Sequence, residues 1–392
     1  MEHIPNLPDS SSSTLILSHP TPEECTTIWT STSSSWKDSL PTSTYLRESQ
    51  YLTTVPLAKN GGLTLWILVD RSQSPRTILC SCETFRKRSL VSNASGRVRD
   101  VFVHGVASVF CEEKYRGRGY AGRMMRELKS ALSNWQEDIC GVGKCVGSVL
   151  YSDIGKEYYA KFGWRPTPTN THVMFKPVES VDRWWQGPET CISKEDLPAL
   201  CGKDEVMIRK AMSVPVDGDA AQERFSIVPD VDHMLWHMGK EEFTCNILFG
   251  KVPEVKGAIA GPEDPADRKG DNTLYILRIV VERDYEESNE STNALEPCGT
   301  DWLQRQFIGR SQLAYLETVL RAAQNEAEEW KLDQVKLWHP TPEITRMLSR
   351  LDIGHVVEER EEYSIASVLW FDRNGGEGPP PLWINNEHYA WC

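Results

Sequence analysis

The sequence lacks the features that would place the protein in a membrane, on a nucleic acid or outside the cell. Its longest apolar runs are about as long as a strand, so none could cross a bilayer as a helix. The net charge of −13 argues against nucleic acid as the main partner, because phosphate binding needs a cationic face. An acidic protein instead attracts cations, amines among them. The polar start, MEHIPNLPDSSSS, has no signal-peptide core, and we expect a cytoplasmic protein.

The cysteines and histidines do not form a convincing metal or disulfide pattern. The eleven cysteines include no CxxC pair and their number is odd, which favours reduced thiols. Cys80 and Cys82 flank a single residue, so on a strand they would share one face as buried thiols. His233 and His237 stand one helical turn apart, as in some zinc sites, but with no third ligand in view packing is the favoured interpretation. We predict no metal.

Apolar periodicity predicts an α/β protein with a mixed sheet in its first half. A length of 392 residues suggests two or three domains. Strands are predicted at 14–18, 63–70, 76–85, 97–110, 144–151 and 171–175. Helices are predicted after Pro22 and at 43–52, 118–135 and 155–163.

A weaker version of the same order follows a boundary at 178–190. Strands are predicted at 243–250, 255–261, 273–281, 332–339 and 363–371, and helices at 311–330 and 342–354. The repeated order predicts a decayed internal duplication, with domains at 1–179 and 180–392. The segment 298–310, which precedes the second long helix, has no glycine-rich basic turn. We therefore expect the second copy to have lost the loop described next.

A flexible, cationic turn precedes the first long helix. The stretch EKYRGRGYAGRMM, residues 113–125, contains Arg116, Gly117, Arg118 and Gly119 in succession. The start of a helix exposes unpaired N–H groups and a partial positive charge, so such a turn suits a phosphate group. The spacing is neither that of a Walker loop nor that of a dinucleotide fingerprint.

The chain resembles the Gcn5-related N-acetyltransferases (GNAT). Their signature of Arg or Gln, two residues, Gly, one residue and Gly or Ala matches Arg116, Gly119 and Ala121. The strand HGVASVF precedes it, and an amphipathic helix, the strand CVGSVLY and the segment YYAKFGW follow. A narrower similarity, to the fungal L-lysine N6-acetyltransferases of lysine catabolism, is seen in the segment HGVASVFCEEKYRGRGYA, in the strand CETFRKR and in the long second half. The resemblance implies tandem GNAT-like domains, the second of them degenerate.

The resemblance also implies where acetyl-CoA lies. In this superfamily it occupies a gap between two splayed parallel strands, here 107–111 and 145–151. Backbone groups of Val109, Phe110 and Cys111 would pair with the pantetheine arm. The N–H groups of the loop would hold the diphosphate, across Arg116, Gly117, Arg118, Gly119, Tyr120 and Ala121.

The transfer needs one group that protonates the departing sulfur and one that deprotonates the amine. Tyr159, which the resemblance places before AKFGW, is the candidate acid; the alternative is that it only packs under the sheet. Its neighbour Tyr158 is expected in the core. Histone-modifying relatives carry a carboxylate where Gly105 stands here, which leaves the base unassigned.

Glu83 is the first candidate base, because a carboxylate inside an apolar strand is costly without a partner. It could equally be a strand-end carboxylate paired with Arg86 or Arg88. His104 and Asp100 are weaker candidates, each expected to be an ordinary residue of the sheet.

The expected activity is direct acetyl transfer from acetyl-CoA to the N6-amine of free L-lysine, with the second half walling the substrate side and offering carboxylates. Alternatives are a polyamine, an aminoglycoside-like amine or a protein lysine as acceptor, and a sensor that binds coenzyme A without turnover. The aromatic tail PLWINNEHYAWC is expected to dock on the body, at the substrate entrance.

Overall fold

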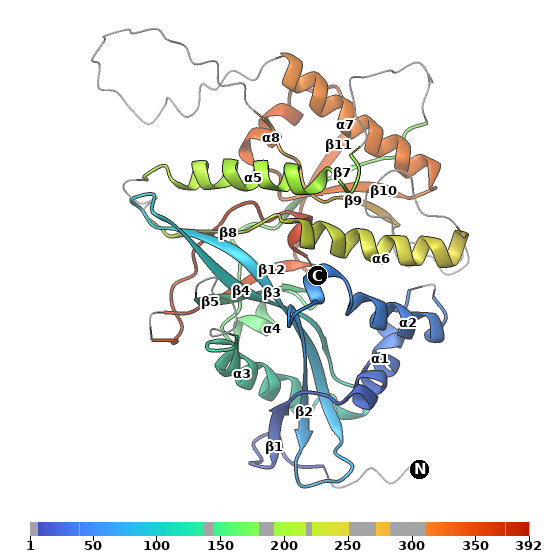
Figure 1. Ribbon diagram of the computed structural model, residues 1–392, viewed down its shortest axis with the longest axis vertical. Helices are drawn as coiled ribbons and strands as arrows, with labels where there is room; N and C mark the ends of the chain where they lie inside the picture. The colour runs from blue at the N-terminus through green and yellow to red at the C-terminus, as the bar shows by residue number, and fades with distance from the viewer. Residues whose placement is uncertain are drawn as a thin grey trace.

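The computed structural model describes residues 7–38, 40–136, 144–179, 192–216, 222–250, 272–282, 310–372 and 374–391. It has two mixed sheets with helices on their faces, which confirms the predicted α/β class (Figure 1). Its helices are α1 (Pro22–Trp36), α2 (Thr42–Leu52), α3 (Tyr120–Leu132), α4 (Glu157–Ala160), α5 (Leu197–Met212), α6 (Val231–Phe249), α7 (Arg310–Glu329) and α8 (Pro342–Leu348). No helix of the described ranges is both long enough and apolar enough to cross a membrane.

The larger sheet is built mainly by the first half of the chain. Its main path runs β1-β2-β3-β4-β5-β12-β6, and β8 and β13 extend it beside the far end of β3. The strands are β1 (Leu15–Ser18), β2 (Leu63–Asp70), β3 (Ile78–Ser92), β4 (Val98–Phe110), β5 (Cys145–Ser152), β6 (Arg165–Pro166), β8 (Arg224–Ile227), β12 (Ile365–Trp370) and β13 (Leu382–Trp383). Two neighbouring pairs in this sheet run parallel, β4 with β5 and β8 with β13.

The smaller sheet has the order β11-β7-β10-β9. It consists of β7 (Thr171–Phe175), β9 (Thr273–Ile276), β10 (Gln334–Trp338) and β11 (His355–Glu359). Helices α7 and α8 cover it with a core of their own, in which Leu316, Leu320 and Met347 pack against Phe175 and Leu337. Figure 1 shows α5 and α6 crossing the molecule between α7 and α8 at one end and α1 to α3 at the other.

Each half supplies strands to the sheet of the other: β8, β12 and β13 join the larger sheet, and β7 joins the smaller one. In the larger sheet β5 is parallel to β4, and the strand on its other side is the antiparallel β12 from the second half, followed by β6. In the smaller sheet β10 is parallel to β9, and the strand on its other side is the antiparallel β7 from the first half, followed by β11. The two halves therefore share the same strand pattern, and each completes the sheet of the other.

One predicted strand of the second half is wrong. Residues 243–250 continue α6, which begins after the cap Asp230 and ends at Gly250 with φ +65°. A short apolar run has no periodicity that separates a buried strand from a helix, and the preceding residues propagate the helix. The predicted strand 255–261 and the segment 298–310 lie outside the described residues, as does most of the boundary segment 178–190.

The long helix of the first half packs as its periodicity predicted. Five residues of α3 are fully or almost fully buried against the larger sheet, namely Tyr120, Met124, Met125, Leu128 and Leu132. Cys80 and Cys82 lie in the same core, on one face of β3 as expected. Packing on this face fixes the start of α3 beside the end of β4, where the candidate site lies.

Candidate active site

The parallel strands β4 and β5 separate at one end. Their pairing runs from Phe102 opposite Cys145 to Val106 opposite Leu150. Strand β4 then continues to Phe110 without pairing to β5, so its last four residues leave one side open. This is the splayed pair that the sequence resemblance implied for acetyl-CoA.

A β-bulge on β4 brings a hydroxyl to Glu83. Opposite β3, Ala107 pairs with Glu83 and Phe110 with Ser81, so β4 has one extra residue between these pairs. Ser108, at the bulge, has the left-handed φ of +52°. Its Oγ donates a hydrogen bond of 3.0 Å to Oε2 of Glu83. Burial raises the pKa of Glu83, and this hydrogen bond opposes the rise.

A cavity of about 610 Å³ opens over the split strands. Its floor includes Glu83 and the residues from Val106 to Phe110, and Tyr159 of α4 also lines it. Helices α1 and α2 supply one wall with aromatic and polar side chains, including Trp29, Trp36, Tyr45 and Glu48. The second half contributes Trp236, Lys240 and Trp391 to the described lining. A shallower hollow of about 570 Å³ shares Phe110 and Arg116 with this cavity and extends it toward the glycine loop.

Tyr159 stands at the cavity with a phenol that remains protonated. Its ring packs partly against the core under α3 and edge-on to Tyr158, with ring centroids 5.1 Å apart. Burial, reinforced by the neighbouring Tyr158, raises the pKa of Tyr159. No hydrogen bond joins its hydroxyl to another residue in the described part of the chain, so the proton is available to a bound molecule. Tyr158 is only half-buried beside Phe162 and is not part of the core expected for it.

The glycine loop is exposed and leads directly into α3. Gly117 and Gly119 have φ of +75° and +82°, and Gly119 caps the helix without a side-chain hydrogen bond. The first N–H groups of α3 are thus left without a capping side chain, and they carry the positive end of the helix dipole. A Cβ at Gly117 would meet no atom within 4 Å, whereas one at Gly119 would lie 2.9 Å from Oγ of Ser10.

The remaining residues named for cofactor binding lie on both sides of this loop. Val109 and Phe110 line the cavity, and Cys111 follows them, partly buried against the core. Nε of Arg116 donates to the carbonyl oxygen of Cys111 at 2.9 Å, which holds the arginine over the end of β4. Arg118 is exposed. Tyr120 and Ala121 begin α3, and the Tyr120 ring is buried in the core.

Packing explains why position 105 is occupied by a glycine. It lies opposite Phe85 in the register of β3 and β4. A Cβ there would come 2.4 Å from Cε of Lys87, whose buried side chain crosses the position. The Nζ of Lys87 donates to the carbonyl oxygen of Ala390 at 3.0 Å. A side chain at position 105 would therefore require the buried Lys87 side chain to move.

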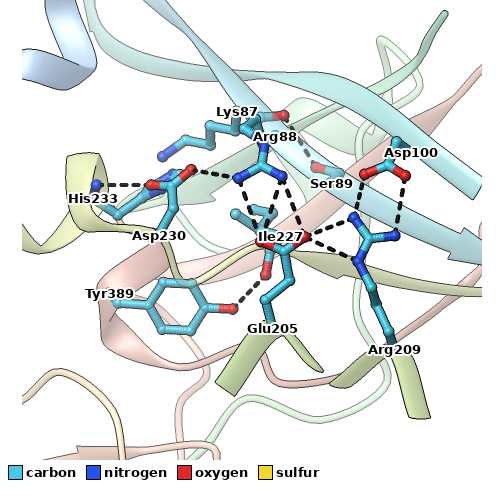
Figure 2. Close-up of polar contacts among 10 residues, drawn as sticks. All are labelled: Lys87, Arg88, Ser89, Asp100, Glu205, Arg209, Ile227, Asp230, His233 and Tyr389. Carbon is cyan, nitrogen blue, oxygen red and sulfur yellow. Dashed lines mark hydrogen bonds and ion pairs between the residues drawn. The ribbon is translucent and has the colours of Figure 1, made fainter. Parts of the chain in front are cut away.

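The other candidate bases lie in structural contacts away from the cavity. Figure 2 shows Asp100 paired with Arg209, which lowers the pKa of that carboxyl. His104 is buried with Nε2 at 3.3 Å from the carbonyl oxygen of Trp135, and burial lowers its pKa to about 4. Figure 2 also shows Arg88 beside Glu205 and Asp230, so this arginine pairs with carboxylates other than Glu83.

The two histidines of the possible zinc pair have separate packing roles. Nδ1 of His233 lies 2.8 Å from Asp230, and Nε2 of His237 lies 3.2 Å from the carbonyl oxygen of Tyr389. Within the described ranges, no group of three or more potential ligands could hold a metal ion. These contacts support packing over ligation.

The aromatic tail docks on the body of the molecule. Tyr389 is fully buried, and its hydroxyl donates to the carbonyl oxygen of Ile227 at 2.7 Å (Figure 2). Glu387 is buried in an ion pair with Arg278, which also binds Asp204. These contacts position Trp391 at the cavity wall.

Several cavity residues had not been singled out from the sequence. Trp236 and Lys240 are four residues apart and so share a helix face, but the residues just beyond them were assigned to a strand. Glu48 belongs to a predicted helix, yet nothing local shows which element that helix faces. The four lining carboxylates, Asp38, Glu48, Glu83 and Asp153, all come from the first half, whereas the second half supplies a cation, Lys240.

Sequence comparisons agree with this architecture. Residues 172–392, more than half of the chain, match the family described as the LYC1 GNAT-like C-terminal domain. An uncharacterized protein of Saccharomyces cerevisiae is 22% identical over 357 residues, which cover 84% of this chain and 82% of that protein. A lysine acetyltransferase of Yarrowia lipolytica is 25% identical over 246 residues, 54% of this chain and 60% of that protein.

Two solved structures resemble the chain over most of its length. A probable N-acyltransferase of Enterococcus faecalis has 11% identity and a TM-score of 0.49, covering 91% of this chain and 73% of its own. A GCN5-related N-acetyltransferase of Kribbella flavida has 12% identity and a TM-score of 0.48, covering 92% and 72%. Because the family match spans more than half of the chain, the protein belongs to the LYC1 GNAT-like family and is an acetyl-CoA-dependent N-acetyltransferase of the Gcn5-related superfamily.

Proposed function

We propose that the protein transfers the acetyl group of acetyl-CoA to the N6-amine of free L-lysine. The observation that carries this proposal is the single cavity lined by Glu83, Tyr159 and the open end of β4. The similarity to the lysine acetyltransferase of Yarrowia lipolytica supports lysine as the acceptor. The four carboxylates of the lining suit a substrate with a net positive charge.

The end of β4 and the glycine loop would hold acetyl-CoA. Val109 and Phe110 offer backbone groups on the side of β4 that β5 leaves open. The exposed N–H groups at the start of α3 would bind the diphosphate, with Arg116 and Arg118 adding charge. The absence of a capping side chain at Gly119 and the open space at Gly117 fit such an anion.

Glu83 and Tyr159 would move the protons of a direct transfer. Glu83 takes a proton from the substrate ammonium, and the neutral amine attacks the thioester carbonyl carbon. The new N–C bond forms as the carbonyl oxygen becomes anionic. The C–S bond then breaks, Tyr159 protonates the departing thiolate, and the amide loses its remaining extra proton to water. Because the pKa of Glu83 is raised, its carboxylate is a stronger base than that of an ordinary glutamate.

Thiol release tests this proposal against its alternatives. The purified full-length chain is mixed with acetyl-CoA and one amine at a time from a panel of L-lysine, a polyamine, an aminoglycoside and a lysine-containing peptide. We expect free coenzyme A to appear fastest with L-lysine. Preference for another amine would reassign the substrate. Binding of acetyl-CoA with no thiol release from any amine would favour a sensor.

A cytoplasmic location is also part of the proposal. The cysteines of the described ranges are all free thiols, which suits a reducing compartment. Fractionation of cells that express the tagged full-length chain would test it.

A further inference from the structure

A cation without a hydrogen-bonded or ion-paired partner among the described residues lines the acidic cavity. Lys240 lies on α6, and its ammonium forms no hydrogen bond or ion pair with a side chain or carbonyl group of the described ranges. An amine-binding site gains nothing from an ammonium of its own, because like charges repel. Lys240 therefore needs a reason other than attraction of the substrate amine.

An oriented carboxylate lies near this lysine. Glu48 of α2 is buried, and Oγ1 of Thr244, one helical turn beyond Lys240, donates to its Oε1 at 3.0 Å. Burial raises the pKa of Glu48 and the charge of Lys240 opposes the rise, so the two groups are close enough to interact. They are not in contact as an ion pair, and both line the cavity.

An aromatic wall connects this pair of charges with the reaction site. Trp236 lies one helical turn before Lys240, and its ring packs edge-on against Phe85 with centroids 4.8 Å apart. Phe85 is two residues beyond Glu83 on β3, so the two side chains share a face. A flat apolar wall of this kind suits an aliphatic chain with a polar group at each end.

We propose that Lys240 binds the α-carboxylate and Glu48 the α-ammonium of a free α-amino acid, whose side-chain amine then reaches Glu83 and Tyr159. This inference rests on the proposed function and adds the part of the site that selects the substrate class. An opposite pair of charges complements a zwitterionic head group. A polyamine would place an ammonium against Lys240, and a lysine within a peptide has no free α-carboxylate.

Binding measurements separate this inference from the proposed reaction. Calorimetry with the coenzyme-A-loaded full-length protein compares L-lysine with cadaverine, which is lysine without its carboxylate. We expect the Lys240→Met variant to bind L-lysine about 10- to 100-fold more weakly, the range expected for loss of a charge-assisted hydrogen bond. Its affinity for cadaverine should rise, since a like charge is removed. Glu48→Gln should weaken binding of both amines.

Two controls exclude a general loss of structure. Lys59→Met removes an exposed lysine outside the cavity lining and should change neither affinity. The affinity of Lys240→Met for coenzyme A should equal that of the unmodified protein. Wild-type protein that binds cadaverine as tightly as L-lysine, or a Lys240→Met variant with unchanged L-lysine affinity, would overturn the inference.

Turnover, followed as thiol release, is measured separately from L-lysine binding. L-lysine binding that depends on Lys240 in a protein that releases no thiol would sustain the head-group site and refute the proposed reaction. Thiol release with L-lysine that is unchanged by Lys240→Met would support the proposed reaction and refute the head-group site.

Discussion

Burial acts on Glu83 and Tyr159 in the same direction but with different chemical consequences. It raises the pKa of both side chains, because each ionised form is negative. For the glutamate this makes a stronger base, and for the phenol it keeps the proton in place at neutral pH. The two residues thus suit opposite roles at one cavity.

For Tyr159→Phe, we expect kcat to fall by about 10²- to 10⁴-fold, the usual contribution of a general acid. The affinity for acetyl-CoA should remain unchanged, because only the hydroxyl is removed and it binds no other described residue. Steady-state kinetics and calorimetry measure the two quantities. Tyr158→Phe is the matched control, and equal losses in both variants would show that Tyr159 has no special role.

The pH dependence of the rate tests Glu83. The base must be ionised, so activity should rise with pH through the raised pKa of Glu83, above the 4.5 of an ordinary glutamate. For Glu83→Gln, we expect a kcat about 10²- to 10⁴-fold lower and the loss of this acidic limb. A variant that retains both the rate and the limb would assign the base to another group.

The same variant should be more stable than the wild type at neutral pH. Between the ordinary and the raised pKa, the native state binds more protons than the unfolded state, so stability falls as pH rises through that window. Glutamine does not ionise, so the variant avoids this loss of stability. Thermal melts of the ligand-free proteins should therefore differ at pH 7 and converge toward pH 4.

At the scale of elements, the start of α3 depends on backbone conformation more than on side chains. Its amphipathic pattern was enough to predict the helix, and the glycines predicted the turn before it. The bulge at Ser108 was not predictable, because its φ of +52° results from the register of β4 against β3. The strand expected at 243–250 failed because a short apolar run suits either element.

An anion at Gly117 should weaken acetyl-CoA binding. Aspartate tolerates a positive φ better than most residues, and a Cβ at Gly117 would meet no atom within 4 Å. Its charge beside the diphosphate should raise Kd by about 10-fold or more. Gly250→Asp, with φ +65° and equally open space, is the matched control at the end of α6. Equal affinities of the two variants would place the diphosphate elsewhere.

At the scale of the whole molecule, the exchanged strands make the two halves depend on each other. Periodicity along the chain predicted most strands, but pairing between β5 and β12 joins residues about 215 positions apart and leaves no local signal. The cavity also leaves no local signal in the sequence, because Trp236, Lys240 and Trp391 come from the second half. The sequence therefore predicted the glycine loop better than the part of the cavity wall that the second half supplies.

We expect residues 1–179 alone not to fold, because β5 would lose β12 and β7 would lose both of its neighbours. Co-expression with residues 180–392 should restore a stable complex, and the intact chain should unfold in one calorimetric transition. Circular dichroism and size-exclusion chromatography measure the fragments. A monomeric, folded fragment 1–179 would show that the exchange is dispensable.

The position of β12 between β5 and β6 also bears on biosynthesis. Chains ordinarily fold from the N-terminus as they leave the ribosome, one domain after another. Here the larger sheet is incomplete until Ile365–Trp370 has emerged, although its neighbours β5 and β6 are made long before it. Nascent chains therefore expose the unpaired edge of β5 until β12 has been made, and we expect chaperones that cover such edges to assist the folding of this protein.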